Sequence, residues 1–247
     1  MISEDSEALA GGNMGEVSRR GDTVVRPAGA WTPAVHRLLR ELVAAGVRGV
    51  PQPVTIGEDH EVLGFIIGTV PNDPTPEWVW AEAALLSSAR LLRRAHDVTS
   101  GLDTQGPWRS PVREPAEVIC HNDFAPYNLV FDKGVVVGAI DWDYASPGPR
   151  LWDLAYLAYR IVPLSCGDRR DGFTDEERAQ RLRRLLAAYG CDAEPRHVND
   201  VLRDRLLALA TFSDDMAQRL GKPELSEHAA LYRSDAAGLT TTEPPAT

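Results

Sequence analysis

The sequence predicts an α+β chain of two lobes, with a small β-rich N-terminal lobe at residues 1–70 and a larger, mainly helical C-terminal lobe at residues 71–247. Three observations predict this division. Short apolar runs separated by turn residues dominate the first part of the chain. Apolar residues at helical spacing dominate the remainder. The Pro-rich segment 69–76 (TVPNDPTP) separates the two patterns, as a linker does.

The N-terminal lobe is predicted to hold strands and one helix. The helix occupies residues 32–45, where Thr32 is the candidate N-cap, Pro33 suits the first turn and Gly46 follows as a stop. Its apolar residues recur at helical spacing and form one face. The strand candidates are residues 16–20 (EVSRR), 23–27 (TVVRP) and 61–70 (EVLGFIIGTV), with a tight turn between the first two.

The C-terminal lobe is predicted to hold helices on either side of a strand-containing segment at residues 118–141. A capping box of Thr174 and Glu177 begins one helix, and Gly190 ends it. Helices therefore make up most of this lobe. The helical segments are residues 75–96, 150–162, 174–189 and 195–233.

Composition indicates a globular protein. Of the 247 residues, 43% are hydrophobic and 25% are charged, which is an ordinary balance. No apolar window of about 18 residues predicts a membrane span, and the acidic N-terminus predicts no secretory signal. The widely spaced Cys120, Cys166 and Cys191 suit reduced thiols. We therefore expect a cytoplasmic protein with no membrane partner.

The net charge of −10 argues against a nucleic-acid partner, because such binding requires basic groups that neutralise phosphates. An acidic protein attracts cationic small molecules, although the same charge also serves solubility alone. Charge therefore excludes one class of partner and leaves the ligand and the oligomeric state open.

Polar side chains that can do chemistry interrupt an apolar segment at residues 118–131 (VICHNDFAPYNLVF). Asp123 lies two residues after His121 and five residues before Asn128. The run LVF, the turn DKG and the run VVVGAI then lead to Asp141, so a hairpin would bring Asn128 and Asp141 close together. A single Asp-x4-Asn spacing arises often by chance, so the interpretation depends on the whole set.

These residue types meet the needs of phosphoryl transfer. The reaction requires a carboxylate that orients the attacking hydroxyl and accepts its proton, and oxygen ligands for the Mg²⁺ ions that bridge the phosphates. Asp123 can be the base, while Asn128 and Asp141 offer the ligands. The spacing H-x-D-x-x-x-x-N followed by a strand-borne Asp is typical of kinase catalytic loops. The sequence contains no P-loop, nucleophile elbow or paired zinc-ligand spacing.

The stretches HNDFAPYNLVF and GAIDWDYASPGPRLWDLAY resemble the aminoglycoside phosphotransferase family, whose members share a protein-kinase-like fold. The resemblance covers the core of the C-terminal lobe strongly and the N-terminal lobe weakly. It implies that Asp123 is the catalytic base and that His121 braces the loop. It also implies that Asn128 and Asp141 are the Mg²⁺ ligands.

The same resemblance implies a structural role for Asp153, which would anchor the catalytic loop. Most family members carry glycine after the motif histidine, where this chain has Asn122. Asp143 is left open between a contribution to metal binding and a place in solvent.

For the N-terminal lobe, the resemblance implies a nucleotide site that departs from the usual pattern. Kinase-like enzymes use a Gly-rich turn over the phosphates and a strand lysine paired with a helix glutamate. Here the lysine position holds arginine, and the helix offers only His36 and Glu41 as partners. An ordinary turn and a surface arginine are the alternatives. The implied nucleotide contacts are Gly11, Gly12 and Gly15 in the turn GGNMG, Arg26 at the lysine position, and Ile67 and Thr69 at the adenine hinge.

The sequence therefore predicts an ATP-dependent phosphotransferase, with GTP as the alternative donor, that uses Mg²⁺ to phosphorylate a hydroxyl of a small molecule. The resemblance implies an aminoglycoside or another cationic, amine-bearing natural product as acceptor, and hence antibiotic resistance. The alternatives are a choline, homoserine or peptide natural-product kinase, and a non-catalytic kinase-like binding or immunity protein. Acids of the helical lobe that could face ammonium groups are Asp168, Asp171, Asp175, Asp214 and Asp215.

Overall fold

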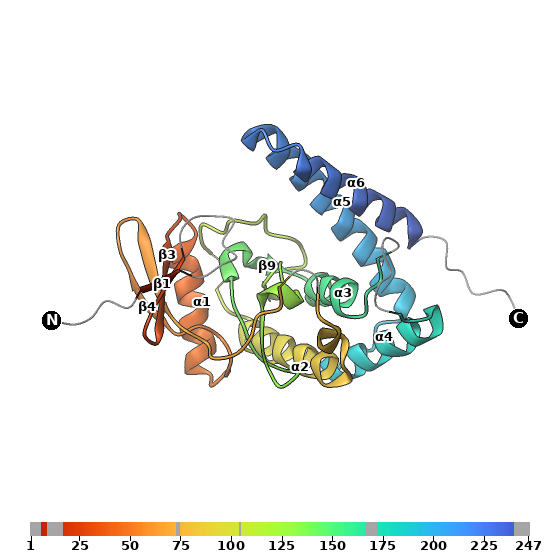
Figure 1. The fold of residues 1–247 in the computed structure, drawn as a ribbon, viewed down its shortest axis with the longest axis horizontal. Coiled ribbons are helices and arrows are strands. Elements are labelled where there is room, and N and C mark those ends of the chain that lie inside the picture. The colour runs from red at the N-terminus through yellow and green to blue at the C-terminus, as the bar shows by residue number, and fades with distance from the viewer. Residues whose placement is uncertain (1–5, 9–16, 73–74, 104, 166–171, 240–247) are drawn as a thin grey trace, which may run out of the picture.

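The computed structural model describes residues 6–8, 17–72, 75–103, 105–165 and 172–239. It confirms the predicted α+β architecture, because an antiparallel sheet with one helix comes first and a larger helical part follows (Figure 1). The sheet and helix α1 lie at one end of the molecule, and the C-terminal helices extend toward the other end (Figure 1).

Five antiparallel strands form the N-terminal sheet, in the order β1-β2-β3-β5-β4. The register of β3 and β5 places Arg26 directly opposite Glu61, so the two side chains project from the same face. The predicted tight turn is present, with Gly21 at φ +59°. The third predicted strand is shorter than expected and stops at Gly64. The strands are β1 (Ser6–Ala8), β2 (Ser18–Arg20), β3 (Thr23–Pro27), β4 (Pro53–Ile56) and β5 (His60–Gly64).

Helix α1 (Thr32–Ala44) is the predicted amphipathic helix. The prediction of Thr32 as the N-cap is wrong, since Trp31 holds that position and Thr32 is the first helical residue. Pro33 then falls in the first turn, where its missing N–H costs no hydrogen bond. Of the apolar residues that the spacing placed on the core face, Val43 is partly buried against the core and the others are buried: Val35, Leu38, Leu39 and Leu42.

Helices build most of the C-terminal part. The prediction of a helix from residue 75 is wrong at its start, because the extended backbone of Ala81 separates the short η1 (Glu77–Trp80) from α2 (Glu82–Thr99). The predicted capping box is present at the start of α4, and Gly190 ends that helix in a left-handed conformation. Helices α5 and α6 pack side by side (Figure 1). The remaining helices are α3 (Arg150–Ile161), α4 (Asp175–Tyr189), α5 (Pro195–Leu220) and α6 (Glu224–Gly238).

The middle of the chain forms two short two-stranded sheets. Strand β6 pairs with β9, and β7 pairs with β8 in the predicted hairpin. Lys133 and Gly134 have φ of 50° and 78°, as a tight two-residue hairpin turn requires. A bridge between Thr69 and Phe131 ties the segment after the N-terminal sheet to this hairpin. The elements are β6 (Val118–Cys120), η2 (Pro126–Asn128), β7 (Leu129–Asp132), β8 (Val135–Ala139), η3 (Trp142–Tyr144) and β9 (Ser146–Gly148).

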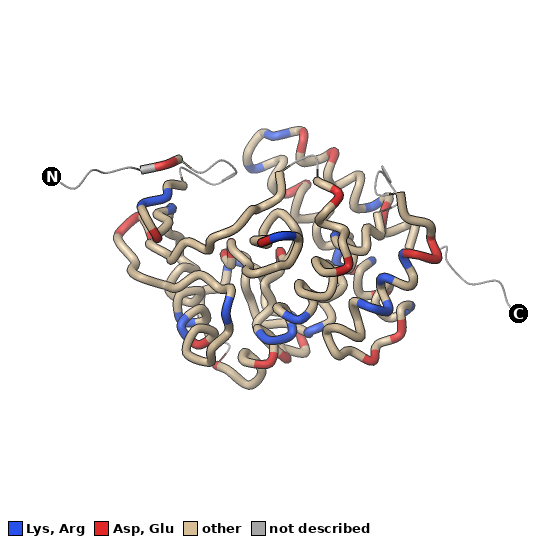
Figure 2. The backbone as a smooth tube through the Cα atoms, turned by 60° about the horizontal axis from the view of Figure 1, so that its bottom comes forward, with Lys and Arg blue, Asp and Glu red and all other residues tan. Residues whose placement is uncertain are grey.

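One hydrophobic core runs from α1 through the hairpin into α2, α3 and α4. Figure 2 shows acidic and basic residues interspersed along the described chain. Within these described residues, no helix is both long and apolar enough to cross a membrane. The loop that contains the predicted catalytic-loop motif packs against this hydrophobic core.

Candidate functional site

The loop after β6 begins with an unusual backbone turn at Asn122. Its φ is +64°, a left-handed conformation that glycine and asparagine adopt most readily. Its Nδ2 donates to the Tyr144 carbonyl at 2.9 Å and to the Ser146 hydroxyl at 2.8 Å. Arg205 of α5 donates to the Asn122 carbonyl. Asn122 thus makes a turn that glycine also makes easily, and it adds side-chain bonds that fix the loop.

Asp153 on α3 holds the same loop through both carboxylate oxygens. It accepts hydrogen bonds from His121 N at 2.6 Å and from Asn122 N at 2.8 Å, and one oxygen lies 3.2 Å from His96 Nε2. Burial alone would raise the pKa of Asp153, but its contact with His96 holds that pKa below the ordinary value. These bonds are those of a structural anchor for the loop.

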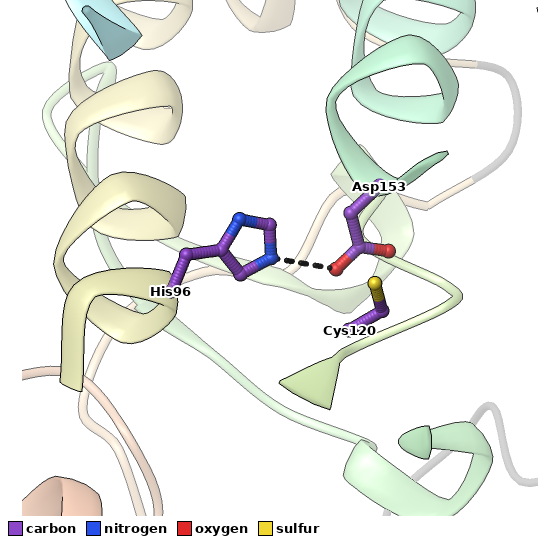
Figure 3. A group of neighbouring side chains, drawn as sticks. All are labelled: His96, Cys120 and Asp153. Carbon is purple, nitrogen blue, oxygen red and sulfur yellow. Dashed lines mark hydrogen bonds and ion pairs between the residues drawn. The ribbon is translucent and has the colours of Figure 1, made fainter. Parts of the chain in front are cut away.

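The side chains of His96, Cys120 and Asp153 lie together behind the loop (Figure 3). Their donor atoms are within 4.8 Å of one another, which is close enough to hold a metal ion. Burial raises the pKa of the Cys120 thiol well above its ordinary value, and Sγ donates to the Pro149 carbonyl at 3.4 Å. Metal ligation needs a thiolate and free carboxylate lone pairs. The cluster therefore favours a hydrogen-bonded support over a metal site.

Asp123 accepts hydrogen bonds on both carboxylate oxygens. The Tyr127 hydroxyl donates to Oδ1 at 2.5 Å, and Asn128 Nδ2 donates to Oδ2 at 2.9 Å. Burial raises the pKa of Asp123, although the bond from Tyr127 works in the opposite direction. A carboxylate with a raised pKa is a stronger base at neutral pH.

His121 is fully buried beneath Asp123 and is held at both ring nitrogens. Its Nδ1 accepts from Asp123 N at 3.2 Å, and its Nε2 lies 2.9 Å from the Ile140 carbonyl. The imidazole thus connects the catalytic-loop motif to the end of the hairpin. This geometry suits a brace better than a group that contacts a substrate.

Asp141 lies just beyond β8, at the hairpin end that also carries Asn128. Ile140 N donates to the Asn128 carbonyl at 2.8 Å, which brings the two predicted metal ligands to the same place. Asp141 has φ +58° and ψ 63°, a left-handed conformation that is uncommon for non-glycine residues and that Asp and Asn adopt more often than most. Its side chain is 45% exposed, so the carboxylate is accessible.

Arg26 on β3 contacts three carboxylates. Its Nε lies 2.8 Å from Glu61, its Nη1 lies 3.1 Å from Asp141, and its Nη2 lies 2.5 Å from Asp143. The second oxygen of Glu61 lies 2.7 Å from His36 Nε2 on α1. Burial opposes the charge on Arg26, but these acids raise its pKa above the ordinary value. The network joins the N-terminal sheet, α1 and the end of the hairpin.

The other predicted nucleotide contacts are placed less favourably. Thr69 N and O are both bonded to Phe131, each at 2.8 Å, so neither backbone group is free to read a base. The Ile67 side chain is 78% exposed. The hinge role of Ile67 and Thr69 stays a prediction. The predicted Gly-rich turn, Gly11, Gly12 and Gly15, lies outside the described residues.

The oxygen donors at the hairpin end suit Mg²⁺. Asn128 uses Nδ2 toward Asp123, which leaves its Oδ1 for a cation, and Asp141 offers an accessible carboxylate. Mg²⁺ prefers such hard oxygen ligands and keeps several waters. The cationic Arg26 side chain already rests against Asp141. The residues present therefore fit the ion, which Asn128 and Asp141 would hold.

Several residues of the site were not predicted. Glu61 joins Arg26 to His36, a link that depends on the pairing of β3 with β5 and has no local signal. Arg205 reaches the loop from far along the chain. Tyr127 had a signal, since it is a hydroxyl-bearing residue inside the Asp-x4-Asn spacing.

Comparisons with known proteins agree with this architecture. The phosphotransferase enzyme family matches residues 71–199, which is just over half of the chain. The chain is also 35% identical over 204 residues to the trifolitoxin immunity protein of Rhizobium leguminosarum bv. trifolii, covering 78% of this chain and 77% of that protein.

Solved structures share the fold at low identity. A choline/ethanolamine kinase family protein from Mesorhizobium loti has a TM-score of 0.67 at 20% identity, covering 97% of this chain and 89% of its own. Plasmodium vivax ethanolamine kinase has a TM-score of 0.64 at 12% identity, covering 94% of this chain and 81% of its own. The GDP complex of aminoglycoside 2'-phosphotransferase-IIIa has a TM-score of 0.66 at 16% identity, covering 94% of this chain and 92% of its own. The chain therefore belongs to the phosphotransferase enzyme family and has its protein-kinase-like fold.

Proposed function

We propose that this chain is a Mg²⁺-dependent phosphotransferase of the cytoplasm that transfers the γ-phosphate of ATP to a hydroxyl of a small molecule. One observation carries the proposal. Asp123 is hydrogen-bonded to Asn128, and the hairpin register brings Asn128 to the same end as Asp141. A base and two oxygen ligands in one place are what phosphoryl transfer requires of a protein.

In the proposed step, Asp123 orients the acceptor hydroxyl and takes its proton as the acceptor oxygen attacks the γ-phosphorus. The bond between that phosphorus and the bridging oxygen breaks, and ADP leaves. His121, Asn122 and Asp153 hold the loop so that Asp123 keeps its position. When bound by Asn128 and Asp141, Mg²⁺ supplies charge neutralisation for the phosphates.

Arg26 is proposed as the phosphate contact that replaces the usual lysine. Its three nitrogens already contact carboxylates, but a guanidinium has five N–H donors in a fixed fork. Arg26 can therefore share its donors between Glu61 and a phosphate oxygen. Binding of Mg²⁺-nucleotide is then expected to release Arg26 from Asp141.

The acceptor is proposed from the neighbouring activities. An aminoglycoside is the first candidate because of the family resemblance, and a choline-like or homoserine-like metabolite or a peptide natural product is the next. The test is incubation with Mg²⁺-ATP and kanamycin, choline or homoserine, with ADP and phosphorylated product measured by mass spectrometry. A chain that neither binds Mg²⁺-nucleotide nor turns it over would overturn the proposal.

A second candidate function is a kinase-like binding or immunity protein without catalysis. Two observations favour it: the relative named for trifolitoxin immunity, and the ion pair that occupies Asp141. Cells that express this chain can be challenged with trifolitoxin, with and without Asp123→Asn. Protection that survives the substitution supports binding, whereas protection that is lost while the protein stays folded supports phosphoryl transfer.

A further inference from the structure

The approach to Asp123 is lined by tyrosine hydroxyls. The Tyr127 hydroxyl donates to Asp123 Oδ1 at 2.5 Å and lies 2.9 Å from the Tyr156 hydroxyl. The other oxygen of Asp123 accepts from the buried Asn128, whereas Oδ1 lies on the side of the more exposed Tyr127, so an acceptor hydroxyl would approach Oδ1. Tyr127 is 39% exposed and is therefore accessible from the surface. The Tyr127 hydroxyl marks the place where the acceptor hydroxyl would arrive.

A cationic side chain borders this place. Arg160, in the last turn of α3, has its Cζ 5.3 Å from the Tyr127 ring centroid and 5.8 Å from that of Tyr159. The side chain is partly exposed. Among the residues that the structure describes, no ion pair joins Arg160 to a carboxylate, and its guanidinium lies against the tyrosine rings. A guanidinium with aromatic walls and no acidic partner is a binding group for an anion.

Of the five acids expected to face an ammonium group, two form ion pairs with other arginines. Asp214 pairs with Arg233, and Asp175 lies 3.8 Å from Arg178. Asp215 is exposed on α5. Asp168 and Asp171 lie outside the described residues. Within the described part of the chain, none of these five acids pairs with Arg160, whose guanidinium lies over the rings of Tyr127 and Tyr159.

Asp235 of α6 is also near the tyrosines but is not a counter-ion for Arg160. Its Oδ2 accepts hydrogen bonds from the Tyr159 hydroxyl at 2.6 Å and from the Ser165 hydroxyl at 2.7 Å. Asp235 is only 1% exposed, so a ligand does not reach it from solvent. Its contacts hold Tyr159 in place under the guanidinium.

We infer that the acceptor carries a carboxylate close to its hydroxyl and that Arg160 binds this carboxylate. The inference rests on the proposed function, in which Asp123 receives the acceptor hydroxyl. Arginine binds carboxylates through two parallel N–H···O bonds, and tyrosine hydroxyls can donate to the same group. A hydroxy acid, a hydroxyl-bearing amino acid or a peptide with a free C-terminus has this chemistry. Among the acceptors proposed above, the inference therefore favours a homoserine-like metabolite or a peptide over an aminoglycoside, whose ammonium groups the guanidinium would repel.

The test uses two probes that differ in the sign of their charge. 3-Hydroxypropionate and ethanolamine both place a hydroxyl two carbons from the charged group. Their affinities for the full-length chain are measured by saturation-transfer NMR, in wild type and in Arg160→Glu. The wild type is expected to bind 3-hydroxypropionate about fivefold or more tightly than ethanolamine, and Arg160→Glu is expected to reverse this order.

Two further variants isolate the role of Arg160. Arg160→Lys keeps the positive charge and is expected to keep the preference, although the fork geometry is lost. Arg219→Glu makes the same change of net charge at an exposed position near the end of α5 and is expected to leave the preference unchanged. Melting temperatures of all variants show that they are folded.

The outcomes are decisive in both directions. Reversal in Arg160→Glu alone supports the inference. Equal affinities, a preference for ethanolamine, no binding of either probe, or a preference unaffected by Arg160→Glu would overturn it. The binding measurement needs no turnover, so a failure of the proposed function is distinguished from a failure of the inference by assaying Mg²⁺-ATP turnover separately.

Discussion

The two sides of the site are assembled by contacts of very different range. On the C-terminal side, Asp123 is held by Tyr127 and Asn128, four and five residues away in the chain. On the N-terminal side, Arg26 is held by Glu61, Asp141 and Asp143, at separations of 35, 115 and 117 residues.

This difference in range suggests which side of the site tolerates substitution. Short-range bonds within one loop set the placement of Tyr127 and Asn128 around Asp123, and the longer-range bonds of Asp153 and Arg205 hold that loop in the fold, which suits a predicted base that needs rigid placement. Long-range ion pairs depend on how strands and lobes pack, so they accommodate an arginine in place of lysine by recruiting a new partner. We therefore expect substitutions on the C-terminal side to abolish function or folding, and those on the N-terminal side to tune binding.

The largest expected effect follows from Asp123→Asn. The amide cannot accept the hydroxyl proton, so the rate of phosphoryl transfer is expected to fall by about 10²–10⁴-fold. The amide side chain has the same shape as the carboxylate that it replaces, so binding of Mg²⁺-ATP, measured by isothermal titration calorimetry, is expected to stay within about threefold. Unchanged turnover would remove Asp123 from the role of base.

Asp153→Asn tests the support behind the loop. Its carboxylate accepts from two backbone N–H groups and faces His96, so an amide would turn a donor toward a donor in a fully buried place. The free energy of unfolding, measured by urea denaturation, is expected to fall by about 3–5 kcal/mol.

Asp97→Asn is the matched control for that experiment. Asp97 forms exposed ion pairs with Arg93 and Arg150, and its loss is expected to change the free energy of unfolding by less than about 1 kcal/mol. Similar losses in both variants would contradict the anchoring role of Asp153.

The same contrast in range explains what the sequence predicted. The loop, the hairpin and its turn, and the capping box at Thr174 all depend on neighbours within a few residues, and the structure confirms them. The partner of Arg26 depends on strand register, so the expectation of a helix residue missed Glu61. The predicted start of α2 was wrong because one non-helical residue, Ala81, interrupts an otherwise helical pattern.

The region predicted to bind the nucleotide contains a pairing that the sequence does not reveal. Thr69, whose role at the adenine hinge stays a prediction, is hydrogen-bonded through its backbone N and O to Phe131 of the hairpin. Such pairing between distant segments leaves no periodic signal in either one. The predicted catalytic loop, by contrast, has a recognisable spacing of Asp123 and Asn128.

Arg26→Met is expected to give an intermediate effect with opposite signs for two ligands. Loss of the guanidinium removes a cation that competes at Asp141, so affinity for Mg²⁺ alone is expected to rise about threefold. Loss of the phosphate contact is expected to lower affinity for Mg²⁺-ATP about tenfold. Both affinities are measured by calorimetry.

Arg26→Lys serves as the control because it keeps the charge without the fork. It is expected to restore most of the affinity for Mg²⁺-ATP. If Arg26→Met lowered the affinities for Mg²⁺ and for Mg²⁺-ATP equally, the role of Arg26 would be structural, and the side chain would not be shared between Asp141 and a phosphate.

The smallest expected effect is a displacement of the pH profile in Tyr127→Phe. Asp123 must be ionised to accept a proton, so activity is lost as pH falls through its pKa, which burial raises above the ordinary value. The hydrogen bond from Tyr127 lowers that pKa, and its removal is expected to move the acidic limb of kcat/KM to higher pH. The plateau above the limb should fall little, because the phenyl ring keeps its packing.

Tyr189→Phe removes a hydroxyl that bonds His96 and not Asp123, so its acidic limb should coincide with that of the wild type. A limb that moved to lower pH in Tyr127→Phe would show that Tyr127 acts on the base through something other than this hydrogen bond, and the local control of the C-terminal side would need another source.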